Sequence, residues 1–484
     1  MIVLGRRGIK RVMARRLRSL SGFVPVILLL SCSAGGGSDK TGPGSSSGAT
    51  SSGGGPSIKD PDGKAGSLGI DVGGGSGSSD PGCPTSISGT VYDPAGKLPL
   101  YNVVIYERSE PLAPLTQGSS CETCDGNFSG RPVAAAVSDA AGHFKLEGLR
   151  STENVPLVIQ VGKWRREITI PSVPACQETV IEDPELFRLP RSRDEGDLPK
   201  MAVVRGGSEA LECLVRKLGV ADSEFTSDSG DGRVHLYVSE GGTATAGTAT
   251  MSGGAALGSD DALLDDLAKM KAYDMILLGC EGTDNIIEGR AVSQYLNVRN
   301  YADQGGRIFG SHYHDKFIWN DKTEDMPYPE VVKFSSGASA LPSPAVGTIN
   351  TSFPKGQALA DWLVNVKAST TPGQISIIDA ENTVESVMHP NAISWIGSPD
   401  AKTPGAPIYF SFPTPVDGPA CGRMVFSDIH VASGSGDSGK APFPEGCTNP
   451  ELTPQQAALA FMIFDLSSCV QPEKDDVRPP VVVK

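Results

Sequence analysis

The chain lacks a hydrophobic run long enough to cross a membrane. The apolar stretch near its N-terminus covers only residues 22–30, whereas a spanning helix needs about 20 apolar residues. The first 31 residues also contain no Asp or Glu, and all of their Lys and Arg precede Ser19. A basic segment followed by a short apolar one is typical of a secretory signal. We therefore expect residues 1–31 to be a signal peptide and the remainder to be exported.

Aromatic residues are absent from residues 32–82, and apolar residues are scarce there. This segment consists almost entirely of Gly, Ser, Asp and Pro, so it cannot bury enough surface to offset the entropy lost on ordering. We expect residues 32–83 to be a disordered, flexible tether. At the other end of the chain, we expect residues 471–484 to be a disordered tail.

The apolar stretch ends in Leu29-Leu30-Ser31-Cys32, which resembles the bacterial lipobox. The resemblance implies cleavage before Cys32, lipidation of its sulfur and a membrane as partner through that lipid anchor. Ser33 follows where an aspartate would favour the inner membrane, so the resemblance implies an outer-membrane lipoprotein. An ordinary signal peptide and an uncleaved anchor are the alternatives.

Positive charge is scarce in the expected mature chain. The signal removes seven of the 42 Lys and Arg, which leaves 35 against 56 Asp and Glu, a net charge of 35 − 56 = −21. Such an acidic surface disfavours nucleic acid and anionic lipid headgroups. We therefore expect no nucleic-acid partner, and we expect the lipid to do the anchoring.

Nine cysteines follow Cys32. In an oxidising compartment most should be paired, and the odd number leaves at least one thiol. Cys121 and Cys124 have the spacing of a redox or metal dithiol, but no second pair stands at zinc spacing. We expect them to staple a loop, each bonded elsewhere in the chain.

Residues 84–191 alternate short β-prone runs with turn residues, which predicts an antiparallel β-sandwich. Residues 87–96, ISGTVYDPAG, and 138–146, SDAAGHFKL, resemble the opening strand and the hairpin of carboxypeptidase-regulatory-like (transthyretin-like) domains. Asp139 and Gly142 are expected in the tight turn, with Phe144 and Leu146 on one strand face. The resemblance implies a structural or ligand-presenting role without catalytic residues.

Residues 198–470 alternate buried strands with helices, which predicts an α/β domain with a doubly wound, flavodoxin-like or Rossmann-like parallel sheet. Residues 273–282, YDMILLGCEG, resemble a strand and loop of class I glutamine-amidotransferase-like domains. Residues 301–312, YADQGGRIFGSH, are similar to their ThuA-like relatives, and 422–430, GRMVFSDIH, to the strand that delivers the family's histidine. The whole combination resembles myxobacterial-type lipoproteins.

The resemblance implies that the glutaminase nucleophile is lost. His312 stands where the family has its cysteine, in a "G-x-C-x-G" elbow. His430 matches the family's histidine, but Ala432 replaces the orienting glutamate. Cys280 lies on the neighbouring loop and would need a base to act as a nucleophile.

A ligand pocket is expected where the predicted parallel strands end, because open α/β sheets bind ligands there. Seven residues fall at those ends: Cys280, Glu281, His312, His314, Asp315, Asp428 and His430. Among them His312, His314, Asp315 and His430 have side chains that bind zinc or another divalent metal. Exposed or core histidines without a metal are the alternative.

We expect a lipid-anchored protein whose amidotransferase-like domain has a binding or scaffold role rather than a catalytic one. Its ligand would be a cell-surface carbohydrate or another surface protein, and no resident cofactor is expected. The alternative is a hydrolase of carbohydrate or peptidoglycan that uses His312 and His430, either with a divalent metal or as acid and base.

Overall fold

The computed structural model describes residues 83–121, 124, 128–239, 251, 255–282, 289–319, 328, 331–431, 435–472, 474 and 482. The predicted signal peptide, Cys32, the tether up to residue 82 and Ala432 lie outside these residues, as does most of the predicted tail. All described residues belong to one compact unit, Ser78–Lys484. Within the described part, the helices are too short or too polar to span a bilayer.

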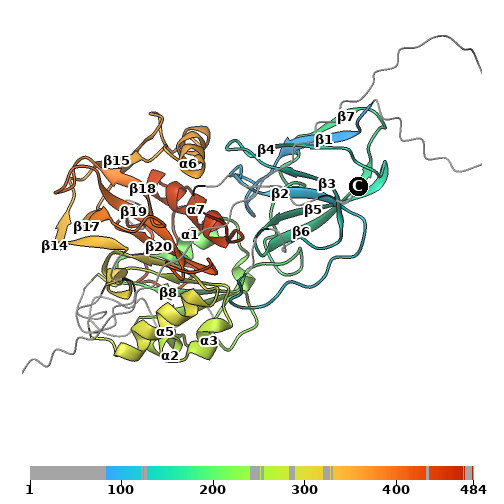
Figure 1. The fold of residues 1–484 in the computed structure, drawn as a ribbon. Coiled ribbons are helices and arrows are strands. Elements are labelled where there is room, and N and C mark those ends of the chain that lie inside the picture. Colours follow the sequence, from blue (N-terminus) through green and yellow to red (C-terminus); the bar gives the residue numbers. More distant parts are fainter. Residues whose placement is uncertain are drawn as a thin grey trace, which may run out of the picture. The chain divides into compact units, whose positions relative to one another are not determined.

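The first part of the described chain is built on strands (Figure 1). Its strands are β1 (Ser86–Thr90), β2 (Val104–Arg108), β3 (Pro132–Val137), β4 (His143–Glu147), β5 (Glu153–Val161), β6 (Trp164–Ser172) and β7 (Glu178–Ile181). They form a three-stranded sheet, β4-β1-β7, and a four-stranded sheet, β3-β2-β5-β6. Buried residues of both sheets, such as Ile87 and Leu157, belong to one hydrophobic core, as in a β-sandwich.

The hairpin before β4 has the expected local geometry. The Asp139 carboxylate accepts hydrogen bonds from the amides of Ala141 (2.8 Å) and His143 (2.9 Å), and Gly142 has φ 75°. Phe144 and Leu146 are buried between exposed neighbours. One prediction is wrong in detail: β1 and β7 pair in parallel, so the sheets are not wholly antiparallel.

The second part is built on an eleven-stranded sheet with the order β11-β10-β8-β12-β13-β20-β19-β18-β15-β16, with β9 beside β10. Its parallel strands are β8 (Met201–Arg205), β9 (Phe225–Thr226), β10 (Val234–Val238), β11 (Gly258–Ser259), β12 (Met275–Leu278), β13 (Arg307–Ser311) and β20 (Gly422–Ser427). Strands β15 (Ala345–Ile349), β16 (Gln374–Ile377), β18 (Ile393–Ser398) and β19 (Ala406–Thr414) extend it in antiparallel pairing.

The sheet is therefore mixed, and the predicted doubly wound parallel sheet is not shown. The link from β19 to β20 is short, and such a link joins antiparallel strands because a parallel crossover needs a dozen residues or more. A further pair, β14 (Val332–Ala340) and β17 (Glu381–Val387), forms a separate two-stranded sheet. Strand β14 lies within residues 313–374, a stretch that resembles no segment of the amidotransferase-like family, whereas β17 follows that stretch.

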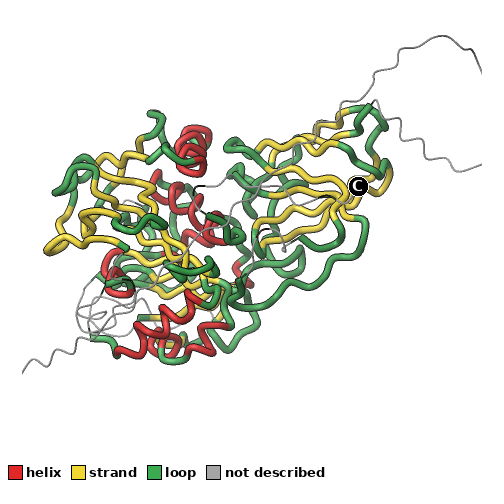
Figure 2. The backbone as a smooth tube through the Cα atoms, in the orientation of Figure 1, coloured by secondary structure: helices red, strands yellow, loops and turns green. Residues whose placement is uncertain are grey.

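Two sets of helices pack on the large sheet, and one of these helices, α6, lies beside the antiparallel strand β15 (Figures 1 and 2). The first set is α1 (Leu211–Lys217), α6 (Pro354–Asn365) and α7 (Pro454–Ser467), and the second is α2 (Asp260–Leu264), α3 (Leu267–Lys271) and α5 (Val292–Asp303). Along β8, Met201 and Val203 join the core of the first set, and Ala202 and Val204 join that of the second. This alternation marks a strand that is buried on both faces.

The sequence of residues 208–218 predicts a helix that is capped by Ser208, but helix α1 begins later. Its N-cap is Ala210, and no side chain caps the helix. Residues 206–210 therefore form a loop at the end of β8. This loop brings Glu209 to the edge of the sheet where the predicted site residues lie.

Disulfides and ion pairs join the two parts of the chain. Cys121 bonds to Cys421, and Cys124 bonds to Cys469. The ammonium of Lys163, at the β5–β6 turn, lies 2.6 Å from the Asp274 carboxylate before β12. Cys121 and Cys124 are therefore bonded elsewhere, as expected, rather than to each other.

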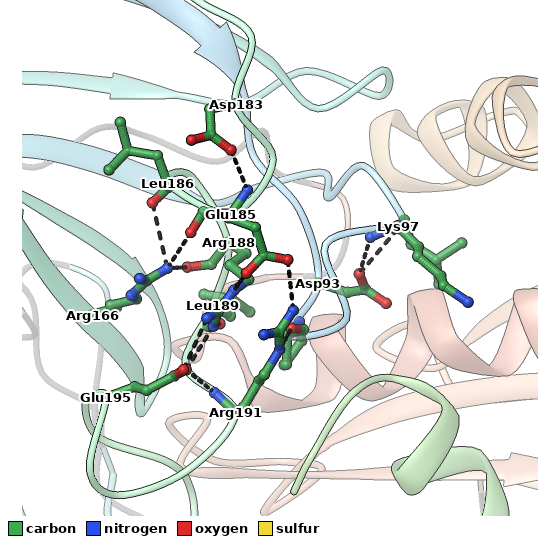
Figure 3. Close-up of polar contacts among 12 residues, drawn as sticks. Asp93, Lys97, Arg166, Asp183, Glu185, Leu186, Arg188, Leu189, Arg191 and Glu195 are labelled. Carbon is green, nitrogen blue, oxygen red and sulfur yellow. Dashed lines mark hydrogen bonds and ion pairs between the residues drawn. The ribbon is translucent and has the colours of Figure 1, made fainter.

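A charged network occupies the stretch that connects the two parts. Arg188 contacts both carboxylate oxygens of Glu195, at 2.6 and 2.8 Å, and also contacts Glu185 at 2.9 Å. Arg191 contacts Glu185 in turn, at 2.8 Å. Figure 3 shows these side chains with Arg166, whose guanidinium donates to backbone carbonyls of the same stretch.

Candidate functional site

Four neighbouring parallel strands deliver the candidate residues to one edge of the sheet. Glu209 follows β8, Cys280 and Glu281 follow β12, His312 follows β13, and His430 follows β20. In the sheet these strands are adjacent, in the order β8-β12-β13-β20. Residues that are far apart in the sequence therefore meet at the carboxyl ends of the strands.

Cys280, His312 and His430 converge. One sulfur or ring-nitrogen atom from each lies within 4.8 Å of the other two. The Cys280 Sγ lies 3.5 Å from His312 Nδ1, and the rings of His312 and His430 meet edge to face, with centroids 5.1 Å apart. Cys280 and His312 are buried, whereas His430 is partly exposed.

His312 occupies a strained backbone position, with φ 46°. A left-handed conformation is rare for a residue other than glycine and costs about 1–3 kcal/mol. It is also the kind of turn on which nucleophile elbows present a side chain at the end of a strand. His312 thus has the backbone expected of the elbow residue, but it carries an imidazole.

Glu209 ties the loops of the site together. Its carboxylate accepts hydrogen bonds from the backbone amides of Cys280 (3.0 Å) and Val431 (2.9 Å) and from the Ser311 hydroxyl. The side chain is fully buried. The sequence did not single out Glu209, because a helix capped by Ser208 would place the residue in its first turn.

Gly206 allows the loop after β8 to approach this cluster. A Cβ atom at this position would lie 2.1 Å from the carbonyl oxygen of Cys280, which is closer than any real contact. Only glycine is therefore compatible with the approach of the two loops.

Burial favours the uncharged forms of Cys280 and His312. Burial raises the pKa of the Cys280 thiol well above its usual value, and the nearby Glu209 carboxylate raises it further. Burial also lowers the pKa of His312 to about 3, with smaller effects from His430 and His314. A protonated thiol beside a neutral imidazole is not the thiolate–imidazolium pair of a cysteine nucleophile.

His314 and Glu281 belong to a separate buried network. His314 Nε2 lies 3.4 Å from the Glu281 carboxylate, which also contacts Arg290 at 3.5 Å and accepts a hydrogen bond from Ser239 at 3.1 Å. Burial disfavours the charged His314 ring, but the charge of Glu281 outweighs it and raises the His314 pKa. His314 is thus paired with an acid, and it does not join His312 and His430 as the sequence predicted.

The two aspartates do not join the cluster either. Asp428 accepts hydrogen bonds from the amide and the hydroxyl of Thr383, all at 2.9 Å, and burial raises its pKa to about 8. Asp315 lies 3.9 Å from the Lys316 ammonium. Of the seven predicted pocket residues, the structure therefore brings three into one cluster and places two in an adjacent ion-pair network.

Comparisons with known proteins return distant resemblances. No family model matches the chain, and no curated protein matches it. A distant structural neighbour is a ThuA-like protein from Bacteroides uniformis, with 13% identity, TM-score 0.28, and coverage of 55% of this chain and 90% of that one. A beta-galactosidase from Bacillus circulans has 8% identity and TM-score 0.26, over 48% of this chain and 28% of the other. These values assign no activity and no site residue to this chain.

Proposed function

We propose that the protein is an exported outer-membrane lipoprotein, anchored by lipid on Cys32, whose 198–470 segment is a ThuA-like domain with a binding or scaffold role. The four disulfides support export, because disulfides persist in oxidising compartments outside the cytoplasm. Under this proposal the carboxypeptidase-regulatory-like segment 84–191 is a spacer.

One observation carries the non-catalytic part of the proposal: the elbow position holds His312, and the nearest thiol cannot serve as its substitute. Cys280 is 0% exposed. A substrate carbonyl would therefore not reach its sulfur. A surface carbohydrate or another surface protein is the ligand class that we propose.

The anchor is tested by cell fractionation and metabolic lipid labelling. The wild type should incorporate lipid and sediment with outer membranes, whereas Cys32→Ser should incorporate none. Cys280→Ser is the matched control, because it makes the same substitution at the other cysteine expected outside the disulfides, and it should remain lipid-labelled. Lipid labelling that survives Cys32→Ser would contradict the proposal.

The binding role is tested with the purified mature protein and cell-wall polysaccharide. Polysaccharide should be retained without release of soluble fragments, and glutamine should not be hydrolysed. Fragment release or glutamine hydrolysis that disappears in His312→Ala would overturn the non-catalytic assignment.

A further inference from the structure

The Cys280, His312 and His430 cluster has the composition of a transition-metal site. It offers one sulfur and two imidazole nitrogens, all within 4.8 Å of one another. Thiolate and imidazole are ligands of zinc and similar borderline metals, whereas magnesium and calcium take oxygen ligands. The donor set therefore selects for a thiophilic transition metal.

The separations fit a single ion. Zinc bonds of about 2.0–2.3 Å in a tetrahedron place neighbouring ligand atoms roughly 3.3–3.6 Å apart. The Cys280 Sγ and His312 Nδ1 already lie 3.5 Å apart. To complete the tetrahedron, the His430 nitrogen must move closer to the other two ligand atoms. His430 is the partly exposed member of the cluster.

His430 has a ring nitrogen that no described residue satisfies. Its Nε2 atom is buried and lacks a hydrogen-bond partner among the described residues. Leaving such an atom unpaired costs about 1–3 kcal/mol, so it requires an explanation. A bond to a metal is one explanation, because it replaces the missing hydrogen bond. On His312 the nitrogen that faces the Cys280 sulfur is Nδ1.

The backbone also orients His430 for metal binding. Its Nδ1 lies 2.8 Å from the Asp379 carbonyl oxygen. A carbonyl only accepts, so Nδ1 must carry the proton, and the lone pair is on Nε2. Metal-binding histidines have this same arrangement, with the second ring nitrogen donating to a carbonyl or a carboxylate.

We propose that Cys280, His312 and His430 bind one zinc ion at the carboxyl end of β12, β13 and β20. On binding, the Cys280 S–H loses its proton to solvent and the sulfur bonds to zinc, with no change in oxidation state. Three protein ligands leave one tetrahedral position for water or for a ligand atom, as in zinc sites that are not purely structural. This site is independent of the lipid anchor.

Glu209 and the backbone of His312 hold the three proposed ligands in position. Glu209 fixes the backbone of Cys280 and of Val431, the residue after His430. The left-handed backbone of His312 directs the third ligand. Strain of this kind is retained where the surrounding structure holds it for a function.

The test measures metal content and spectra of the full mature protein. Chelator-treated, folded protein is exposed to equimolar zinc or cobalt(II) and desalted, and the bound metal is counted by elemental analysis. We expect one zinc per chain and, with cobalt, a thiolate-to-metal charge-transfer band. Cys280→Ala and His430→Ala should each weaken zinc binding by more than about 100-fold, which exceeds the usual effect of losing an outer-shell partner.

A matched control separates ligand loss from general damage. His143→Ala removes an exposed histidine of β4, far in sequence from the cluster, and should retain one zinc and the cobalt band. His430→Ala changes a partly exposed side chain, so it tests the site even if Cys280→Ala does not fold. The proposal is wrong if the wild type retains no zinc, or if folded His430→Ala retains zinc with unchanged affinity.

Discussion

The Glu209 side chain joins the loops of the site. Its carboxylate accepts two backbone amides and the Ser311 hydroxyl in a fully buried position. In Glu209→Gln one oxygen becomes an NH2 group that faces a donor, so a buried hydrogen bond is lost and two donors oppose each other. We expect the free energy of unfolding to fall by about 2–3 kcal/mol in urea denaturation.

A surface glutamate provides the comparison for that substitution. Glu110 pairs with Arg131 at 3.4 Å, and both side chains are more than half exposed. Glu110→Gln should leave the free energy of unfolding nearly unchanged, because exposed ion pairs contribute little. Equal stability of Glu209→Gln and wild type would show that the carboxylate is not needed to hold the loops.

Glu195 should make stability depend on acid pH. The Arg188 guanidinium holds the Glu195 pKa at about 2, below its ordinary value of 4.5. Because the folded-state pKa is lowered, the stabilisation is fully present above pH 4.5 and is lost as the pH falls towards 2. We expect a loss on the order of 1 kcal/mol after solvent screening, measured by urea denaturation at stepped pH.

The comparison for Glu195 is a variant that cannot titrate. Glu195→Gln should be less stable than wild type at neutral pH, and the difference should shrink as the pH approaches 2. A difference that stays constant with pH would mean that the ion pair does not contribute through its charge.

The sequence predicted which residues end the strands, but not where their side chains point. Cys280, His312 and His430 converge because adjacent parallel strands end at one edge. His314 diverges because residues 312–317 form a 3-10 helix, in which three residues make a turn and residues two apart face different ways. That local winding had no signature in the His-x-His pattern.

At the scale of elements, the parallel strands were predictable and the antiparallel ones were not. Apolar runs such as 201–204 and 307–310 predict buried strands, and the structure has β8 and β13 there. By contrast, β15 alternates buried and exposed residues, and β18 and β19 pair with register shifts. Short alternating strands give a weak signal, so the mixed character of the sheet was missed.

The loop that carries Cys121 and Cys124 should act as a clamp between elements. Cys124 bonds to Cys469, just after α7, across 345 residues of sequence. Replacing Cys124 and Cys469 with serine should lower the free energy of unfolding by about 2–5 kcal/mol, because the unfolded chain gains conformational freedom when this bridge is absent. Denaturant titration under oxidising conditions measures this loss.

Unfolding in the presence of a reductant is the control for the Cys124–Cys469 bridge. Once reductant has opened the bridges of the wild type, its stability should approach that of the doubly substituted chain under the same conditions. If the two proteins are equally stable before reduction, the bridge does not clamp the elements.

For the whole molecule, the four bridges and the proposed anchor predict a definite thiol count. The sequence has ten cysteines: eight are in Cys83–Cys176, Cys121–Cys421, Cys124–Cys469 and Cys213–Cys447, and Cys280 is free. If the Cys32 sulfur carries lipid, the denatured but unreduced mature protein should show one reactive thiol, and Cys280→Ser should show none. Two thiols in the wild type would mean that Cys32 is unmodified, and a count of zero would mean that Cys280 is itself oxidised or modified. Because both sulfurs are counted in one alkylation and mass measurement, the experiment tests the anchor and the availability of the proposed zinc ligand independently.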